Sequence, residues 1–126
     1  MLLPLILKRM KYLHTNQHRA LFSPFLRSRN VQAAAMVLRP GQSSSERKEN
    51  EHPRAEQWLF VIRGRGRAKV GSRSVDIQAG SLLLIEKGER HQITCTGQTP
   101  LRTINFYCPP AYDDEGEVLP SAQGQK

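Results

Sequence analysis

Acidic residues are missing from the first third of the chain. Residues 1–45 contain no Asp or Glu but carry seven Lys or Arg, whereas residues 46–126 hold twelve basic and eleven acidic side chains. The formal net charge of +8 therefore comes mainly from this leading segment. A basic chain can bind nucleic acid, but charge confined to one arm is more typical of a solvated surface. Nucleic-acid binding by a basic barrel therefore ranks behind the functions considered below.

Long hydrophobic runs and cysteine are also scarce. A membrane-spanning helix needs ~20 consecutive apolar residues, and no run in the sequence approaches that length. We therefore expect a soluble, cytoplasmic protein without membrane contact. The two cysteines, Cys95 and Cys108, fit no zinc-knuckle spacing, and without a secretory signal they are expected to be free thiols.

Residues 1–13 are apolar first and basic second, and Pro4 interrupts the apolar run. A secretory signal has the opposite order, with charge before ~7–15 apolar residues and a small-residue cleavage site after them. An organellar transit peptide and a natural start at Met10 are both consistent with this composition. We assign residues 1–29 to a basic N-terminal arm that lies partly outside the core.

From residue 31 onward the sequence consists of short apolar or alternating runs separated by glycine or proline. The clearest runs cover residues 31–38, 57–63, 67–70, 74–78, 81–85, 91–96 and 101–107. Short runs at this regular spacing, without a helical period, predict an all-β sandwich or closed barrel. A chain of 126 residues is expected to form one domain. We assign this domain to residues 30–110, followed by an acidic surface tail, residues 111–126.

The first candidate site precedes the apolar run that begins at Gln57. On a strand, residues two apart face the same side, so Asn50 and His52 share a face. Pro53 and the residues after it are expected to reverse the chain before the returning strand. Glu56 and Gln57 point to opposite faces, so only one of them can join His52.

The second candidate is His91, which begins a strand directly after the glycine turn at Gly88. A jelly-roll barrel would place that strand beside the first hairpin. His52, His91 and the amide oxygen of Gln57 would then converge inside an apolar barrel. Buried histidines with nothing to bind are unfavourable unless they are hydrogen-bonded. Imidazole and carbonyl oxygen together suit divalent ions such as Zn, Mn, Fe or Ni, so the two histidines are interpreted as metal ligands.

Both stretches resemble the two sequence motifs of the cupin superfamily. The first motif, G-x5-H-x-H-x3,4-E-x6-G, is matched in its latter part by Asn50-x-His52-x4-Gln57-x6-Gly64. The second motif, G-x5-P-x-G-x2-H-x3-N, is matched in spacing by Gly80-x5-Glu86-x-Gly88-x2-His91-x3-Cys95. The resemblance covers residues 30–110 and implies a cupin-type double-stranded β-helix, that is, a jelly-roll barrel in a single domain.

The resemblance also implies a divalent metal site formed by Asn50, His52, Gln57 and His91. Asn50 stands where the family motif has its first histidine, and Gln57 stands where it has a glutamate. The loop before Asn50 is longer than the family spacing. Glu49 or Glu51 could therefore take the place of Asn50 as a ligand.

All four expected ligands are neutral, so a divalent ion bound to them would keep its full charge. Such an ion favours a small anionic or carbohydrate-like partner and acts as a Lewis acid. The two-histidine-one-carboxylate set of non-haem iron oxygenases is absent from these four residues, so isomerase or lyase chemistry is favoured over oxygenase chemistry. Glu51 or a metal-bound water is the candidate general base. The alternative is a non-enzymatic ligand-binding or sensor domain.

Trp58, Phe60 and Ile62 lie on the strand face opposite Gln57. Small cupins often pair through such faces, so the resemblance implies a homodimer that pairs through this one.

Overall fold

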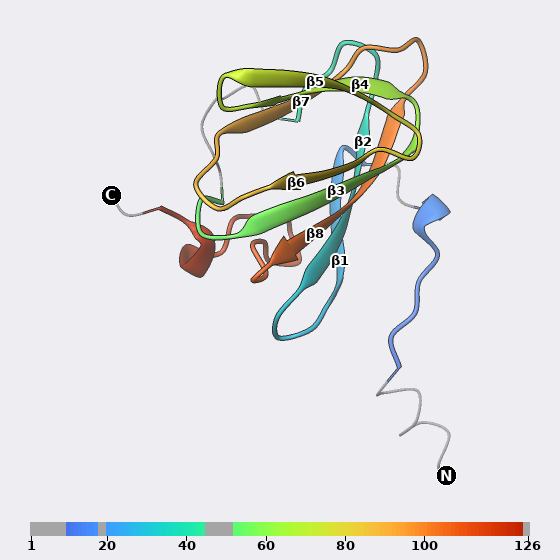
Figure 1. Cartoon of the computed structure of the whole chain (residues 1–126). Coiled ribbons are helices and arrows are strands. Elements are labelled where there is room, and N and C mark those ends of the chain that lie inside the picture. The colour runs from blue at the N-terminus through green and yellow to red at the C-terminus, as the bar shows by residue number, and fades with distance from the viewer. Residues whose placement is uncertain (1–9, 18–19, 45–51, 125–126) are drawn as a thin grey trace.

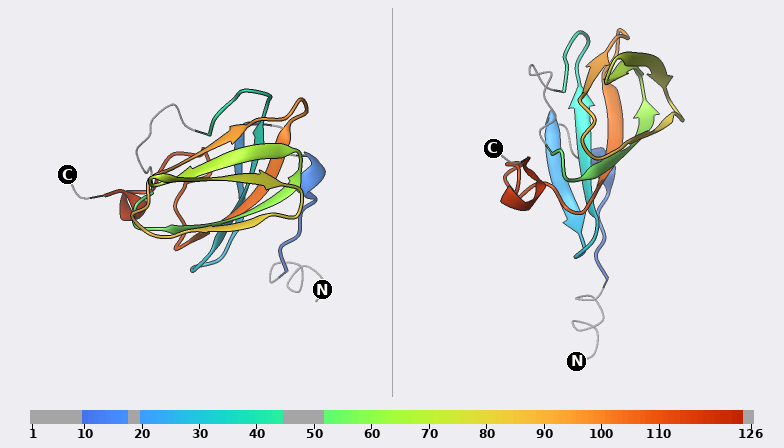
Figure 2. Two further views of the ribbon diagram at one scale, coloured as in Figure 1. Left: turned by 45° about the horizontal axis from the view of Figure 1, so that its top comes forward. Right: turned by 60° about the vertical axis from the view of Figure 1, so that its left-hand side comes forward.

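The computed structural model describes residues 10–17, 20–44 and 52–124. Within these ranges the chain forms eight strands and two short 3-10 helices. The strands make two antiparallel sheets that face each other (Figures 1 and 2). The all-β, two-sheet barrel expected from the sequence is confirmed.

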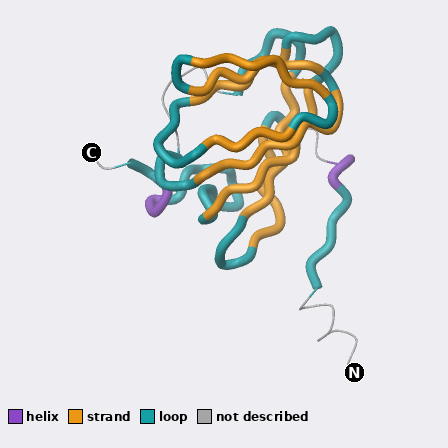
Figure 3. Tube along the Cα trace, viewed as in Figure 1, coloured by secondary structure: helices purple, strands orange, loops and turns teal. Residues whose placement is uncertain are grey.

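The bounds of the strands match the expected runs closely. The strands are β1 (Phe22–Arg27), β2 (Gln32–Leu38), β3 (Glu56–Arg63), β4 (Arg65–Val70), β5 (Arg73–Gln78), β6 (Leu82–Ile85), β7 (His91–Cys95) and β8 (Leu101–Cys108). One sheet has the order β1-β2-β8-β3-β6, and the other has the order β5-β4-β7. The helices η1 (Thr15–Gln17) and η2 (Pro120–Ala122) are purple in Figure 3. No helix of the described residues is long and apolar enough to cross a membrane.

The core lies between the sheets and is built by residues that alternate along each strand. In β3 the side chains of Gln57, Leu59 and Val61 are buried, whereas Trp58 and Phe60 between them are exposed. This period of two follows from strand geometry, and removing the inward apolar side chains from water stabilises the barrel. The main hydrophobic cluster consists of Met36, Leu38, Leu59, Val61, Ala68, Ile77, Ile93, Cys95 and Leu101.

Two glycines shape the connection between β3 and β4. Gly64 has a φ of +95°, a conformation that only glycine adopts readily. A Cβ at Gly64 would lie 2.5 Å from the carbonyl oxygen of Pro100. A Cβ at Gly66 would lie 2.6 Å from Cδ2 of the Leu101 side chain. The glycines of the sequence Arg63-Gly64-Arg65-Gly66 are therefore required by the turn and by the close packing of the barrel.

The C-terminal segment, residues 111–124, differs from the expected surface tail, because Ala111, Tyr112 and Ala122 are buried. Gln32 at the start of β2 provides the physical reason. Its Oε1 accepts the N–H groups of Ala111 and Tyr112 at 3.0 and 2.9 Å, and its Nε2 donates to the Tyr112 carbonyl at 2.7 Å. These buried bonds tie the segment to the barrel. The acidic composition that indicated a solvated tail reflects only the turn within it.

The N-terminal arm also contributes to the barrel. Strand β1 lies within residues 1–29 and pairs with β2. Its Phe22 packs against the main hydrophobic cluster and against a second cluster that includes Tyr107 and Tyr112. The part of the arm from residue 22 onward is therefore integrated into the larger sheet.

Candidate metal centre

His52 is held by the tight turn that precedes β3. The Ala55 N–H donates to the His52 carbonyl at 3.0 Å, and Pro53 takes the first central position of the turn, where its fixed φ is favourable. The ring Nδ1 of His52 lies 3.1 Å from the Ala55 carbonyl oxygen. The turn is also braced by η2, because the Arg54 N–H donates to the Ala122 carbonyl at 3.2 Å. The imidazole is therefore fixed in a fully buried position.

His91 approaches from the other sheet, at the first position of β7. It pairs with Val70 of β4, and its ring Nδ1 lies 3.0 Å from the carbonyl oxygen of Glu89. The ring centroids of His52 and His91 are 4.8 Å apart, with 51° between the ring planes. The two histidines, far apart in the sequence, therefore meet inside the barrel.

Two tyrosines enclose the His52 ring. The ring centroids of Tyr107 and Tyr112 lie 5.0 and 6.0 Å from that of His52, and both contacts are edge-on. Phe22 of β1 in turn packs against both tyrosines. Aromatic pairs in this geometry contribute ~0.5–1.5 kcal/mol beyond the area they bury. The tyrosines thus shield one side of the imidazole from water and restrict its orientation.

Gln57 is oriented by a chain of buried hydrogen bonds between β3 and β8. Its Nε2 donates to Oδ1 of Asn105 at 2.8 Å, and Nδ2 of Asn105 donates to Oγ1 of Thr103 at 3.0 Å. The Thr103 hydroxyl donates to the Met36 carbonyl at 3.4 Å. Because a carbonyl can only accept, the Met36 carbonyl sets the donor-to-acceptor direction of this whole series of hydrogen bonds. Oε1 of Gln57 is consequently turned toward His52, 3.0 Å from its Nε2.

The carbonyl contacts favour one tautomer of each imidazole. A backbone carbonyl can only accept, so a proton on Nδ1 satisfies the contact of each histidine and leaves Nε2 as the nitrogen through which the neutral ring can bind a cation. Nε2 of His52 faces the acceptor oxygen Oε1 of Gln57, so the contact is favourable when a proton or another cation lies between the two atoms. Metal-ligating histidines commonly bond their other ring nitrogen to a carbonyl in this way.

Imidazole nitrogen and amide oxygen are both ligands of divalent metal ions, so these donors fit such an ion. A proton on His52 would place an imidazolium in a fully buried site beside a second histidine, which desolvation opposes. The described part of the chain holds no metal-binding group of three or more His, Cys, Asp or Glu, and the candidate donors here are two imidazoles and an amide.

Burial lowers the pKa of His91 from 6.5 to about 4. Desolvation is the largest cause of the shift, the hydrogen bond to the Glu89 carbonyl opposes it, and the neighbouring His52 adds to it. The ring is therefore neutral at pH 7. Only the neutral form can bind a metal ion, so burial keeps His91 ready to act as a ligand.

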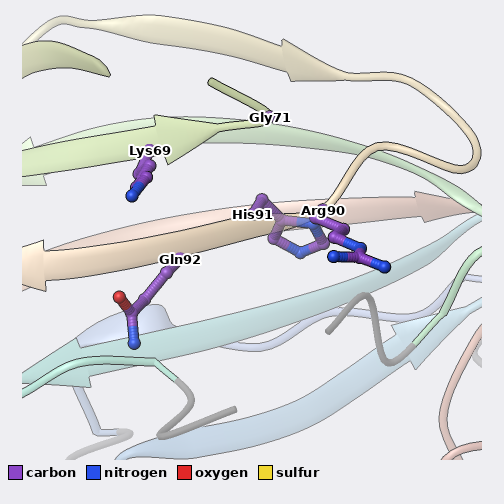
Figure 4. A pocket seen from close by; sticks show the side chains of 5 residues that line it. All are labelled: Lys69, Gly71, Arg90, His91 and Gln92. Carbon is purple, nitrogen blue, oxygen red and sulfur yellow. The ribbon is translucent and has the colours of Figure 1, made fainter. Parts of the chain in front are cut away.

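His91 also borders a hollow of about 140 Å³. The other residues that line it are Lys69, Gly71, Arg90 and Gln92 (Figure 4). Lys69 and Gln92 are paired on β4 and β7, and Arg90 immediately precedes His91. Two of the five lining residues are cationic and none is acidic, so the hollow favours a small anion.

The structure brings together three of the residues that the sequence singled out, His52, Gln57 and His91. Asn50, the expected fourth ligand, and Glu51, the expected general base, lie outside the described residues, as does Glu49. Glu56 points away from the centre, and its carboxylate accepts the Trp58 Nε1–H at 2.6 Å.

Asn105, Tyr107 and Tyr112 were missed by sequence reasoning. Thr103, Asn105 and Tyr107 recur at every second position of β8, and all three are buried. Polar side chains repeated on the inward face of a strand are a signal that could have placed Asn105 and Tyr107 in the centre. Tyr112 carries no such signal, because its position depends on a contact with the remote Gln32.

Solved structures with the same architecture include proteins of two bacteria. BH2720 from Bacillus halodurans is 26% identical, with a TM-score of 0.72, over 82% of this chain and 80% of that one. A predicted oxalate decarboxylase from Thermotoga maritima is 23% identical, with a TM-score of 0.60, over 71% of this chain and 79% of that one. The second likeness, at this identity, shows the fold alone.

One curated relative is the tetracenomycin polyketide synthase protein TcmJ of Streptomyces glaucescens. The chain is 30% identical to it over 67 residues, which cover 53% of this chain and 43% of TcmJ. The chain therefore spans less than half the length of this relative. The family model that describes the cupin domain matches residues 34–107, which include the barrel from β2 to β8. The jelly-roll topology, the paired histidines and this match agree, and the chain belongs to the cupin family.

Proposed function

We propose that the protein is a metal-dependent cupin that binds and transforms a small anionic or carbohydrate-like molecule. His52, Gln57 and His91 would hold the divalent ion. The observation that carries the proposal is the approach of two imidazole rings inside the barrel, with the amide oxygen of Gln57 turned toward Nε2 of His52. All three donors are neutral, so a bound ion keeps its charge and attracts an anionic ligand.

A divalent ion at this position supplies Lewis acidity toward a carbonyl or carboxylate oxygen of the ligand. The residues of the chain have separate tasks around it. Tyr107 and Tyr112 keep water from one side of His52. Asn105 holds the amide of Gln57 in position. This environment favours isomerase or lyase chemistry, with Glu51 as the proposed general base.

The charges near His91 support an anionic ligand. Arg90 and Lys69 line the hollow beside His91 and carry positive charge. Cationic groups at the rim of a site raise the local concentration of anions and speed their association. Asn50 remains the proposed fourth ligand. A sugar acid would be both anionic and carbohydrate-like, so it fits both descriptions of the proposed small molecule.

The experiment is a calorimetric titration of Mn²⁺-loaded protein with oxalate, used as a small dicarboxylate probe. We expect binding to the loaded protein and none after the metal has been removed by a chelator. Arg90→Gln should weaken oxalate binding about tenfold, because it removes one charge from the rim. Arg73→Gln, on the exposed strand β5, is the matched control and should bind oxalate as the wild type does.

A second variant separates metal binding from anion binding. Gln57→Glu adds a carboxylate to the donor set, so it should retain Mn²⁺ but bind oxalate more weakly. Equal oxalate binding by the loaded and chelator-treated proteins would refute the proposal. Product analysis by NMR with a panel of sugar acids then separates an enzyme from a ligand-binding domain.

A further inference from the structure

The outward face of the smaller sheet carries a row of cations along its central strand. On β4, Arg65, Arg67 and Lys69 are exposed, whereas Gly66 and Ala68 between them are buried. Alternate residues of a strand face the same side and lie ~6.6 Å apart along it. The three cations therefore form a row about 13 Å long on the outside of the barrel. We call these three side chains the cation row.

The strands on either side of β4 add hydrogen-bonding groups to the same face. Paired residues of neighbouring strands project to the same side of a sheet. The cross-strand partners of the cation row are Ser74, Asp76 and Gln78 on β5 and Gln92 and Thr94 on β7. Lys69 and Gln92, one such pair, extend from their strands in Figure 4. Four of the five partners are neutral amides or hydroxyls, so they can bond an anion without repelling it.

Of these eight side chains, only that of Asp76 is acidic. Its Oδ1 accepts the Nε–H of Arg67 at 3.2 Å, and both side chains are more than half exposed. An ion pair in such contact with water is weak and is screened by salt. Arg67 can therefore exchange this carboxylate for another anion. Three cations against one carboxylate leave the face with a net positive charge.

A hollow of about 300 Å³ lies beside the cation row. Its lining includes Arg65, Arg67, Asp76 and Gln78. An anion that enters this hollow meets two arginine side chains from the same strand. Arginine binds phosphate through two parallel N–H groups, which makes it a preferred residue for this anion.

Among the described residues, no large exposed apolar side chain lies on this face. The large hydrophobic side chains that are exposed are Met10, Tyr12, Leu21, Val31, Trp58, Phe60, Ile62, Val75, Leu82, Leu84 and Phe106. Only Val75 belongs to the smaller sheet, and it pairs with the buried Ala68 on the opposite face. Protein partners are held chiefly by buried aromatic and apolar anchors, and lipid surfaces by an inserted apolar face. A phosphate backbone needs only cations and hydrogen-bonding side chains such as Ser, Thr and Gln.

We propose that the cation row binds the phosphate backbone of a nucleic-acid duplex. Single strands are held largely by bases that stack on aromatic side chains, and none of the eight positions on this face is aromatic. Contacts to the backbone carry no sequence information directly, so the binding is independent of base sequence. The row lies in the barrel, outside the basic arm of residues 1–29. It also faces away from the interior that holds His52 and Gln57, so it does not depend on the proposed metal centre.

The test measures the affinity of the full chain for a short DNA duplex of mixed sequence, by fluorescence anisotropy over a series of salt concentrations. Each phosphate contact adds about −0.9 to the slope of log K against log salt, so three contacts predict a slope of about −2.7 or steeper. Arg65→Gln and Arg67→Gln should each make the slope shallower by about 0.9, and they should weaken binding equally for different base sequences. Lys69 stays unchanged, because it also borders the hollow beside His91.

Two further variants set the direction and the location of the effect. Asp76→Asn should tighten binding by about threefold, because it releases Arg67 from its carboxylate partner. Arg29→Gln, in the exposed loop between β1 and β2, removes one cation from the other sheet. This matched control should keep the wild-type slope. Circular dichroism and Mn²⁺ binding should match the wild type in all four variants, because none of these side chains points into the barrel.

The same series with an RNA duplex shows which of the two duplexes is bound more tightly. Wild-type slopes in both Arg65→Gln and Arg67→Gln would overturn the proposal, because the binding charge would then lie elsewhere in the chain. Tighter binding of the single strand than of either duplex would also overturn it. So would tighter binding of polyglutamate at equal charge concentration, since the partner would then be an acidic protein.

Discussion

At the scale of single residues, the centre depends on amide groups whose direction is set by their neighbours. Gln57 presents its oxygen to His52 because Asn105 accepts its N–H, and Asn105 is turned in the same sense because it donates to Thr103. None of these polar groups is exposed, so each lost bond leaves a buried group without its partner. The orientation of the Gln57 amide is thus controlled from the interior of the barrel.

This arrangement predicts the effect of removing Asn105. Asn105→Ala should lower the free energy of unfolding by ~1–3 kcal/mol, because it breaks a buried bond at both ends. It should also weaken metal binding by about 10–100-fold, as is typical when the partner of a ligand is lost. Urea unfolding and competition titration with a chromophoric chelator measure the two effects. Thr103→Val, one step further from the donor, is the graded control, and an unchanged metal affinity in Asn105→Ala would contradict the assigned role.

The low pKa of His91 predicts a loss of stability in acid for the metal-free protein. The pKa is about 4 in the folded protein and 6.5 in the unfolded chain, so the unfolded chain takes up the proton first. Unfolding therefore becomes more favourable as the pH falls from 6.5 toward 4. Above pH 6.5, His91 does not change the dependence of the free energy of unfolding on pH. The complete effect is on the order of 3 kcal/mol. Urea unfolding between pH 7 and pH 4 should show a shallower pH dependence for His91→Gln, and equal slopes would exclude His91 as the cause.

At the scale of elements, the C-terminal segment supports the turn that holds His52. The carbonyl of Ala122 in η2 accepts the Arg54 N–H, and the start of the same segment is bound by Gln32 of β2. The segment thus connects the larger sheet to the turn before β3. This connection gives residues 111–124 a role in positioning His52, a proposed metal ligand.

Replacing Gln32 tests this connection. Gln32→Ala removes three buried hydrogen bonds to the segment. It is expected to lower the free energy of unfolding by roughly 2–4 kcal/mol and to weaken metal binding, because the His52 turn loses its brace. Gln78→Ala, at an exposed position of β5, is the control. If Gln32→Ala lost stability but kept the wild-type metal affinity, the segment would serve the fold alone.

The sequence predicted much of the barrel because its patterns are local. Alternation along β3 identified Gln57 as inward and Trp58 as outward, and the structure confirms both positions. The turn signals around Pro53 and Gly88 placed two histidines at strand ends that a jelly roll brings together. The burial of Tyr112 could not be predicted, because it depends on Gln32, 80 positions away. The acidic residues nearby predicted that this segment is exposed to solvent. Composition cannot show which backbone groups are bound by a side chain that is distant in the sequence.

At the scale of the whole molecule, β3 has two different faces. Its inward residue Gln57 lies against His52, whereas its outward residues Trp58 and Phe60 are exposed. The proposed metal donors come from both sheets, since His91 begins β7 of the smaller sheet. A metal ion bound by all three donors would therefore join the two walls of the barrel.

The most direct measurement is the metal content of the full chain, purified without chelators, by elemental analysis. We expect about one divalent ion per chain in the wild type and none in the His52→Ala/His91→Ala variant. His14→Ala, which removes an exposed histidine, is the matched control and should keep the wild-type content. Equal metal content in the wild type and the double variant would contradict the assignment of the centre.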